Sequence, residues 1–161
     1  MEDKVTGVAV GRVDRPVEPG TERRLLGIFI GKWINEGQTI ASGDIPAVKI
    51  LTSDVYEWMP GRFFVLHTAY GRIGNADVGG TEILSYDASS KTYRSLFFDS
   101  QGNINTDVLS VSGNTWTWQG KTHRATAVFS SDGKTQTVHH ERSGDDGNWV
   151  PAMDVVLTKV E

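Results

Sequence analysis

Gly31-Lys32-Trp33 begins a series of short stretches in which polar and apolar residues alternate, and the series continues to Leu157-Thr158-Lys159. Alternation with a period of two is typical of strands that bury one face. A glycine and a tryptophan at the head of such a chain suggest a closed antiparallel barrel that is plugged at one end. A barrel of this size holds either side chains or one small ligand in its interior.

About ten strands are expected, separated by turns rich in Gly, Asn and Asp. They cover residues 32–40, 48–58, 63–72, 81–86, 93–99, 105–111, 115–119, 124–130, 136–142 and 149–160. Gly and Asn supply the positive φ angles that tight hairpin turns need. Many short strands at regular spacing favour an all-β barrel or sandwich. Closure into a barrel is favoured because it leaves no unpaired edge strand.

One short helix is expected before the strands. Apolar residues recur at helical spacing over residues 22–30, which predicts an amphipathic helix with Thr21 as its N-cap and Gly31 as its C-cap. Residues 1–20 are rich in Gly, Pro and charge and are expected to form a partly disordered arm. The barrel domain is therefore expected to span residues 21–161.

Composition excludes several classes of protein. A length of 161 residues suits one domain, and a net charge of −4 without a run of Lys or Arg disfavours nucleic-acid binding. The absence of cysteine excludes disulfides, thiolate zinc sites and cysteine nucleophiles. No stretch approaches the roughly 20 apolar residues of a membrane helix, and the first residues lack the apolar core of a secretory signal. We expect a cytoplasmic protein without a membrane span.

The order of these features resembles the calycins, which include the lipocalins, the fatty-acid-binding proteins and the nitrobindins. A helix, Gly31-x-Trp33, successive hairpins and a last strand ending in a basic residue carry this resemblance. More closely, the chain resembles a bacterial domain family of unknown function assigned to that fold. The matching segments are residues 58–64, 85–87, 98–103, 141–149 and 153–159. The resemblance covers about residues 25–160 and implies a calycin-like barrel without implying a mechanism.

The resemblance also bears on Trp33 and on haem. In calycins the equivalent tryptophan packs at the closed end against a cation from a late strand, here Lys159 or Arg142, in a contact worth about 0.5–2 kcal/mol. The alternative is that Trp33 lines a ligand pocket. Nitrobindins bind haem through a histidine in the C-terminal strand region, whereas the last histidine here is His140 and residues 149–161 contain none. We therefore expect no haem and no other cofactor.

The histidines are candidate ligand anchors. His67 lies in a strand with apolar residues on both faces, so it is expected to be a buried anchor for the polar part of a ligand or a hydrogen-bonded core residue. His139 and His140 are adjacent and point to opposite faces. If Val138 marks the interior, His140 and Arg142 share it and would favour an anionic ligand. Alternatively, Arg142 pairs with an acidic neighbour at the barrel rim.

Sequence motifs for metal binding and for catalysis are weaker than the pattern of candidate ligand anchors. A zinc site of His67, His123 and His140 lacks the close histidine pair that would prepare it, so no metal is expected. No Gly-x-Ser-x-Gly nucleophile motif occurs. Three acidic residues lie within expected strands: Asp54, Glu82 and Asp107. An inward acid beside His67 or His140 would form a proton-transfer pair of the kind an isomerase uses.

Three functions remain open. The leading hypothesis is a protein that binds a small, mostly apolar or amphipathic ligand with a polar or anionic end inside the barrel. Its candidate anchors and stacking surfaces are His67, His140, Arg142, Tyr56, Trp58, Phe97 and Trp118. The second hypothesis is an isomerase-type enzyme in the same cavity. The third is a filled barrel that uses an exposed sheet face to bind another protein or to form a homodimer.

Overall fold

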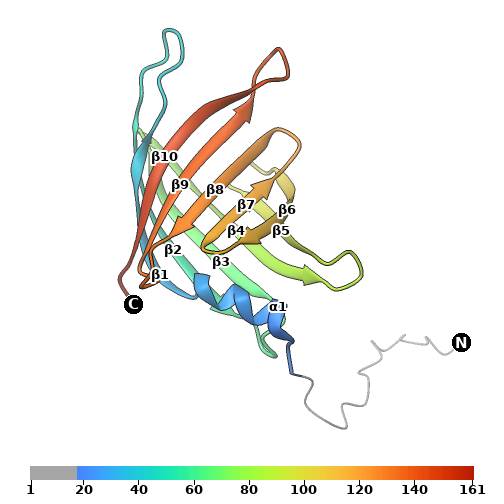
Figure 1. Cartoon of the computed structure of the whole chain (residues 1–161). Helices are drawn as coiled ribbons and strands as arrows, with labels where there is room; N and C mark the ends of the chain where they lie inside the picture. Colours follow the sequence, from blue (N-terminus) through green and yellow to red (C-terminus); the bar gives the residue numbers. More distant parts are fainter. Residues whose placement is uncertain (1–17) are drawn as a thin grey trace, which may run out of the picture.

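The computed structural model describes residues 18–161, in which ten antiparallel strands close into a barrel (Figure 1). The strands are β1 (Gly31–Thr39), β2 (Lys49–Trp58), β3 (Val65–Ile73), β4 (Ala76–Asp87), β5 (Thr92–Asp99), β6 (Ile104–Ser112), β7 (Thr115–Gln119), β8 (His123–Phe129), β9 (Thr135–Ser143) and β10 (Trp149–Lys159). Each strand pairs with the next in sequence, and β1 also pairs with β10. The predicted closed antiparallel barrel is confirmed. Most of the expected arm over residues 1–20 lies outside the described residues.

The predicted short helix before β1 is confirmed, and it consists of two parts. One α-helical turn, α1 (Thr21–Arg24), continues directly into a 3₁₀-helix, η1 (Leu25–Phe29). A 3₁₀-helix has three residues per turn, so Leu26 and Phe29 point to the same side. Both side chains are fully buried. The tighter helix is favoured because it directs both residues into the barrel core.

The predicted helix caps are both wrong in detail. Gly20 occupies the N-cap position, and the Thr21 hydroxyl accepts a hydrogen bond from the Arg24 guanidinium instead of capping the helix. Gly31 begins β1 with a φ of +137°, a backbone conformation that side chains disfavour. A methyl group at Gly31 would lie only 2.5 Å from the Glu161 carbonyl oxygen and from Lys159 Cε. Glycine is therefore required here by backbone angle and by close packing of the C-terminal strand.

The barrel has two different ends. The closed end is where β1 begins, where α1 and η1 lie across the barrel and where the C-terminus is found (Figure 1). The open end carries the connections from β1 to β2, β3 to β4, β5 to β6, β7 to β8 and β9 to β10. Near the open end β10 contains a bulge between Pro151 and Met153, opposite His140 of β9. Within residues 18–161 no helix has the length and apolarity to cross a bilayer.

Candidate ligand-binding site

Side chains that point into the barrel become more accessible from the closed end to the open end. Along β9, Gln136 is 2% exposed, Val138 is 7% exposed, His140 is partly buried and Arg142 is exposed. These residues alternate with outward-facing ones, so they share the inner face. The same trend holds in β3, from Val65 at 0% to His67 at 8% and a partly exposed Ala69. Solvent therefore reaches the interior through the open end.

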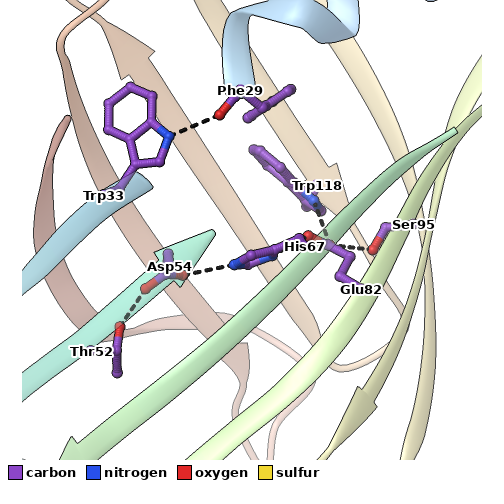
Figure 2. A network of polar contacts seen from close by, with 8 residues as sticks. All are labelled: Phe29, Trp33, Thr52, Asp54, His67, Glu82, Ser95 and Trp118. Carbon is purple, nitrogen blue, oxygen red and sulfur yellow. Dashed lines mark hydrogen bonds and ion pairs between the residues drawn. The ribbon is translucent and has the colours of Figure 1, made fainter. Parts of the chain in front are cut away.

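Trp33 is fully buried at the closed end. Its indole Nε1 donates a 2.8 Å hydrogen bond to the Phe29 carbonyl oxygen, which ties β1 to η1 (Figure 2). Lys159 is the last residue of β10, and its Nζ lies 5.2 Å from the centre of the Trp33 ring. Phe129 packs edge-on against the same indole. Trp33 thus joins the helix, the first strand and the last strand into the plug of the barrel.

A buried polar network crosses the middle of the barrel (Figure 2). His67 on β3 has its Nδ1 2.9 Å from Glu82 Oε1 and its Nε2 2.8 Å from Asp54 Oδ2. Both carboxylates accept, so both ring nitrogens carry a proton and the ring is an imidazolium. Strand pairing explains the arrangement, because His67 lies opposite Tyr56 of β2 and opposite Glu82 of β4.

The pKa values in this network follow from burial and pairing. Burial lowers the pKa of His67, but its hydrogen bonds and the charges of Asp54 and Glu82 outweigh burial and raise it to about 9. Burial raises the pKa of Glu82, but the hydrogen bond and charge of His67 outweigh burial and lower it. His67 is therefore held in its charged form at neutral pH.

The other carboxylate oxygens of Asp54 and Glu82 also accept hydrogen bonds from the protein. Ser95 Oγ and Trp118 Nε1 both donate to Glu82 Oε2, the latter over 3.3 Å. Thr52 Oγ1 donates to Asp54 Oδ1 over 2.6 Å. The Tyr56 ring stacks on the His67 ring with centroids 3.8 Å apart. Both nitrogens and one face of His67 are thus engaged by the protein, which leaves this residue little to offer a ligand.

A second polar cluster lies nearer the open end. His123 Nε2 of β8 is 3.0 Å from His140 Nδ1 of β9, and the two rings lie 5.2 Å apart at 30°. Neither His123 Nδ1 nor His140 Nε2 has a hydrogen-bond partner among residues 18–161. Burial lowers the pKa of His123, and burial with the charge of His123 lowers that of His140 to about 4. Both imidazoles are neutral at pH 7.

Asp107 of β6 lies near His123, although no hydrogen bond between their side chains is found within residues 18–161. Its carboxyl packs against Gly120 in the β7–β8 turn, where a methyl group would lie 2.1 Å from Asp107 Oδ1 and 2.9 Å from the His123 carbonyl oxygen. Burial raises the pKa of Asp107, and the charge of His123 opposes that effect. Because Gly120 has no side chain, the Asp107 carboxyl can occupy this space.

Arg142 and Phe97 complete the open half. Arg142 lies opposite His123 in the β8–β9 ladder, and its exposed guanidinium has no carboxylate at ion-pair distance within the described chain. Phe97 of β5 lies opposite Glu82 on one side and Asn105 on the other, and its side chain is partly buried. The open half therefore holds a cation and two neutral imidazoles on β8 and β9, and one aromatic ring on β5.

The sequence-predicted site residues fall into separate groups. His140, Arg142 and Phe97 lie in the open half, whereas Tyr56 and Trp118 belong to the buried network around His67. Trp58 packs beside η1 at the closed end: a methyl group at Gly27 would lie 3.6 Å from Trp58 Cζ2. His139 lies on the outer face, paired with Asp154. Within residues 18–161 no three His, Asp or Glu side chains are grouped to hold a metal ion.

Sequence reasoning considered His123 and His140 together only as zinc ligands with His67, and it missed the direct hydrogen bond between them. The position of the β8–β9 turn could have revealed this pair. A hairpin centred between Asp132 and Gly133 places Ala125 opposite His140, and His123 is then a diagonal neighbour of His140. Ser95 and Gly120 were also missed. Nothing local distinguishes Ser95 from other strand serines or Gly120 from other turn glycines, since their roles arise from contacts with distant strands.

Two shallow hollows lie on the outside of the barrel. One is lined by outward residues of β8, β9 and β10, among them Val128, His139 and Val156. The other lies over β3, β4 and β5 beside Tyr70 and Phe98, which are 70% and 40% exposed. These hollows are separate from the interior polar clusters, because neither lining includes His67, His123, His140 or Arg142.

Comparison with known proteins supports the fold. The structure is similar to the crystal structure of Rv2717c from M. tuberculosis, with a TM-score of 0.64 and 14% identity over 89% of this chain and 100% of that chain. It is also similar to the S-type phycobiliprotein lyase CPES from Guillardia theta, with a TM-score of 0.54 and 8% identity over 89% and 99% of the two chains. No curated protein matches the sequence. Residues 18–159 match the family described as protein of unknown function (DUF1579), and the chain belongs to that family.

Proposed function

We propose that this protein binds a small, largely apolar ligand in the open half of the barrel, with the polar or anionic end of the ligand at His140 and Arg142. The observation that carries the proposal is the contrast between two polar clusters. The deep network around His67 is closed by partners from the protein, whereas the His123–His140 pair has two ring nitrogens without protein partners.

Neither free ring nitrogen is among the buried unpaired side-chain atoms of residues 18–161, so solvent reaches both and a polar group of a ligand can take its place. Arg142 adds a positive charge at the rim, and a guanidinium suits a carboxylate, sulfonate or phosphate group. Phe97 offers an apolar wall for the rest of the ligand. The Trp33–Lys159 contact supports a calycin-like assignment, and barrels of that kind can hold one small ligand in the interior.

A fluorescent amphipathic anion tests the proposal directly. We expect 1-anilinonaphthalene-8-sulfonate to bind the purified protein with a blue-shifted emission. The variants His140→Phe and Arg142→Gln should weaken this binding by about tenfold each. His139→Phe is the matched control, because it makes the same exchange one residue away on the outer face. Equal affinity of the wild type, His140→Phe and His139→Phe would place the dye elsewhere and refute the proposed site.

An isomerase-type reaction is the second candidate. Both nitrogens of His67 are engaged, so the pair that supports this reading is Asp107 with His123, whose charges interact and where burial raises the pKa of the Asp107 carboxyl. Such a pair can move a proton between two positions of a bound ligand. Native mass spectrometry of the freshly purified protein separates the two candidates in part: a retained small molecule lost on denaturation supports stable binding, and its conversion over time supports catalysis.

A filled barrel that acts through its surface is the third candidate. Exposed Tyr70 and Phe98 beside an outer hollow support it. A homodimer in light scattering that is abolished by Tyr70→Lys, together with no dye binding inside the barrel, would favour this reading over the first.

A further inference from the structure

The outer face of strands β3 to β6 exposes large apolar side chains to solvent. Antiparallel strands with one face in water normally place polar residues on that face. Strand β9 follows this rule, because its outward residues Thr137, His139 and Glu141 are all polar. The outer face of β3 to β6 does not follow it, and its exposed apolar members are Tyr70 (70% exposed), Leu96 (37%), Phe98 (40%), Ile104 (65%) and Val108 (39%).

Strand register makes these side chains one continuous surface. Phe98 of β5 lies opposite Ile104 of β6, and Leu96 lies two residues before Phe98 on the same face. Tyr70 and Phe98 both line the outer hollow over β3, β4 and β5, which has a volume of about 330 Å³. Gly79 lies opposite Tyr70 and has no side chain to fill this space.

The apolar area of this face matches what a stable protein interface needs. Its five exposed members present about 500 Å² to solvent, taking about 200 Å² for a fully exposed large side chain. An interface of standard size covers about 800 Å² on each partner, of which about 60% is apolar. Exposed apolar patches of this extent often mark interaction sites. The face therefore supplies the apolar part of one such interface.

We propose that this protein forms a two-fold symmetric dimer through the outer face of β3 to β6, with Tyr70 of each copy seated in the hollow of the other. A two-fold interface uses the same surface on both copies, so that surface must carry both a projecting group and a hollow that receives it. This face has both, in Tyr70 and in the space above Gly79. Its charged side chains lie at its ends, where Arg72 pairs with Asp77 and Arg94 follows Leu96 toward the closed end.

This inference goes beyond the proposed ligand site. The face lies on the outside of the barrel, and its hollow shares no residue with the His123–His140 cluster. Association through it neither requires nor excludes a ligand in the interior, so the dimer does not depend on a filled barrel.

The mass in solution tests the proposal. Size-exclusion chromatography with light scattering should give the wild type a mass of twice 17.7 kDa. Phe98→Lys should raise the dissociation constant of the dimer at least about a hundredfold, because a two-fold interface would bury the new charge twice. Val156→Lys is the matched control, since Val156 is also 40% exposed but lies on β10, and this variant should remain dimeric.

Chemical cross-linking locates the interface independently. The chain contains no cysteine, so a single introduced cysteine can be linked only to its copy. Thr81 lies opposite Phe98 on the outer face, and we expect a short bis-maleimide to link Thr81→Cys into covalent dimers. Thr126→Cys, on the outer face of β8, should remain monomeric under the same conditions.

Three results would overturn the dimer. The first is a monomeric mass at every concentration up to the solubility limit. The second is a dimer that Val156→Lys dissociates and Phe98→Lys does not. The third is a monomer whose binding of 1-anilinonaphthalene-8-sulfonate is weakened by Phe98→Lys, which would make this face a site for a small apolar molecule. In the first two cases, dye binding that depends on His140 would leave the proposed function standing.

Discussion

Replacement of His67 by leucine should destabilise the barrel strongly. The pKa of His67 is about 9 in the folded chain against about 6.5 in an unfolded one, and each pKa unit corresponds to about 1.4 kcal/mol. The ionised ring therefore contributes about 3 kcal/mol to the free energy of unfolding. Removal of one member of a buried ion pair costs about 3–5 kcal/mol by comparison with other proteins, and the two estimates agree.

The pH dependence tests the cause of this loss. Because folding raises the pKa of His67, its contribution is fully present below about pH 6.5 and is lost as the pH rises through about 9. The difference in free energy of unfolding between the wild type and His67→Leu should therefore be about 3 kcal/mol larger at pH 6 than at pH 10. Urea unfolding followed by tryptophan fluorescence at both pH values measures it.

Two further variants make the test specific. His139→Leu removes the exposed His139–Asp154 pair and should cost less than 1 kcal/mol at either pH. Glu82→Gln in the His67→Leu background removes one of the two buried carboxyl groups left facing each other and should restore part of the stability. A difference between wild type and His67→Leu that stays constant from pH 6 to pH 10, or that is below about 1 kcal/mol at pH 6, would refute the charged-network reasoning.

Trp33→Ala should lower the free energy of unfolding by about 3–5 kcal/mol, because it empties the site of a fully buried indole and removes the hydrogen bond to the Phe29 carbonyl. A small shift of the urea midpoint at unchanged m-value would contradict the assignment of Trp33 to the plug of the barrel. Gly120→Ala should displace the Asp107 carboxyl, because the added methyl group would lie 2.1 Å from Asp107 Oδ1, and it should alter the affinity for 1-anilinonaphthalene-8-sulfonate at least threefold. An unchanged affinity would show that Asp107 is not part of the proposed ligand site. Because burial lowers the pKa of His140 to about 4, the wild type should lose about 2.5 kcal/mol of stability relative to His140→Phe between pH 7.5 and pH 4.5. Parallel stability curves of the two proteins would argue against a neutral His140 ring.

Much of the fold could be predicted from local pattern. The strand β7 (Thr115–Gln119) was predicted to the residue, because alternation and hairpin glycines mark it on both sides. The helix before β1 was predicted in place, but its division into an α-helical turn and a 3₁₀-helix was not, because helical spacing in a short apolar segment does not distinguish the two. The tight turn that buries both Leu26 and Phe29 is set by the barrel end they cover.

Much less of the site could be predicted. The sequence indicated that His139 and His140 face opposite ways, since neighbours on a strand always do. It did not indicate that His67 would be enclosed by carboxyl groups, because Asp54 and Glu82 reach it from two different neighbouring strands. Proximity of that kind depends on the register of each hairpin.

The sequence by itself determined the class of the molecule: alternation, turn glycines and the Gly31-x-Trp33 start specify short antiparallel strands that need closure, and these are properties of residues a few positions apart. Only the tertiary structure decided which polar residues meet inside the barrel. The pairing of His123 with His140, the enclosure of His67 and the place of Asp107 against Gly120 each require a specific register between strands. Burial and partner distance then set the pKa values, so the chemistry of the interior exists only once the barrel has closed.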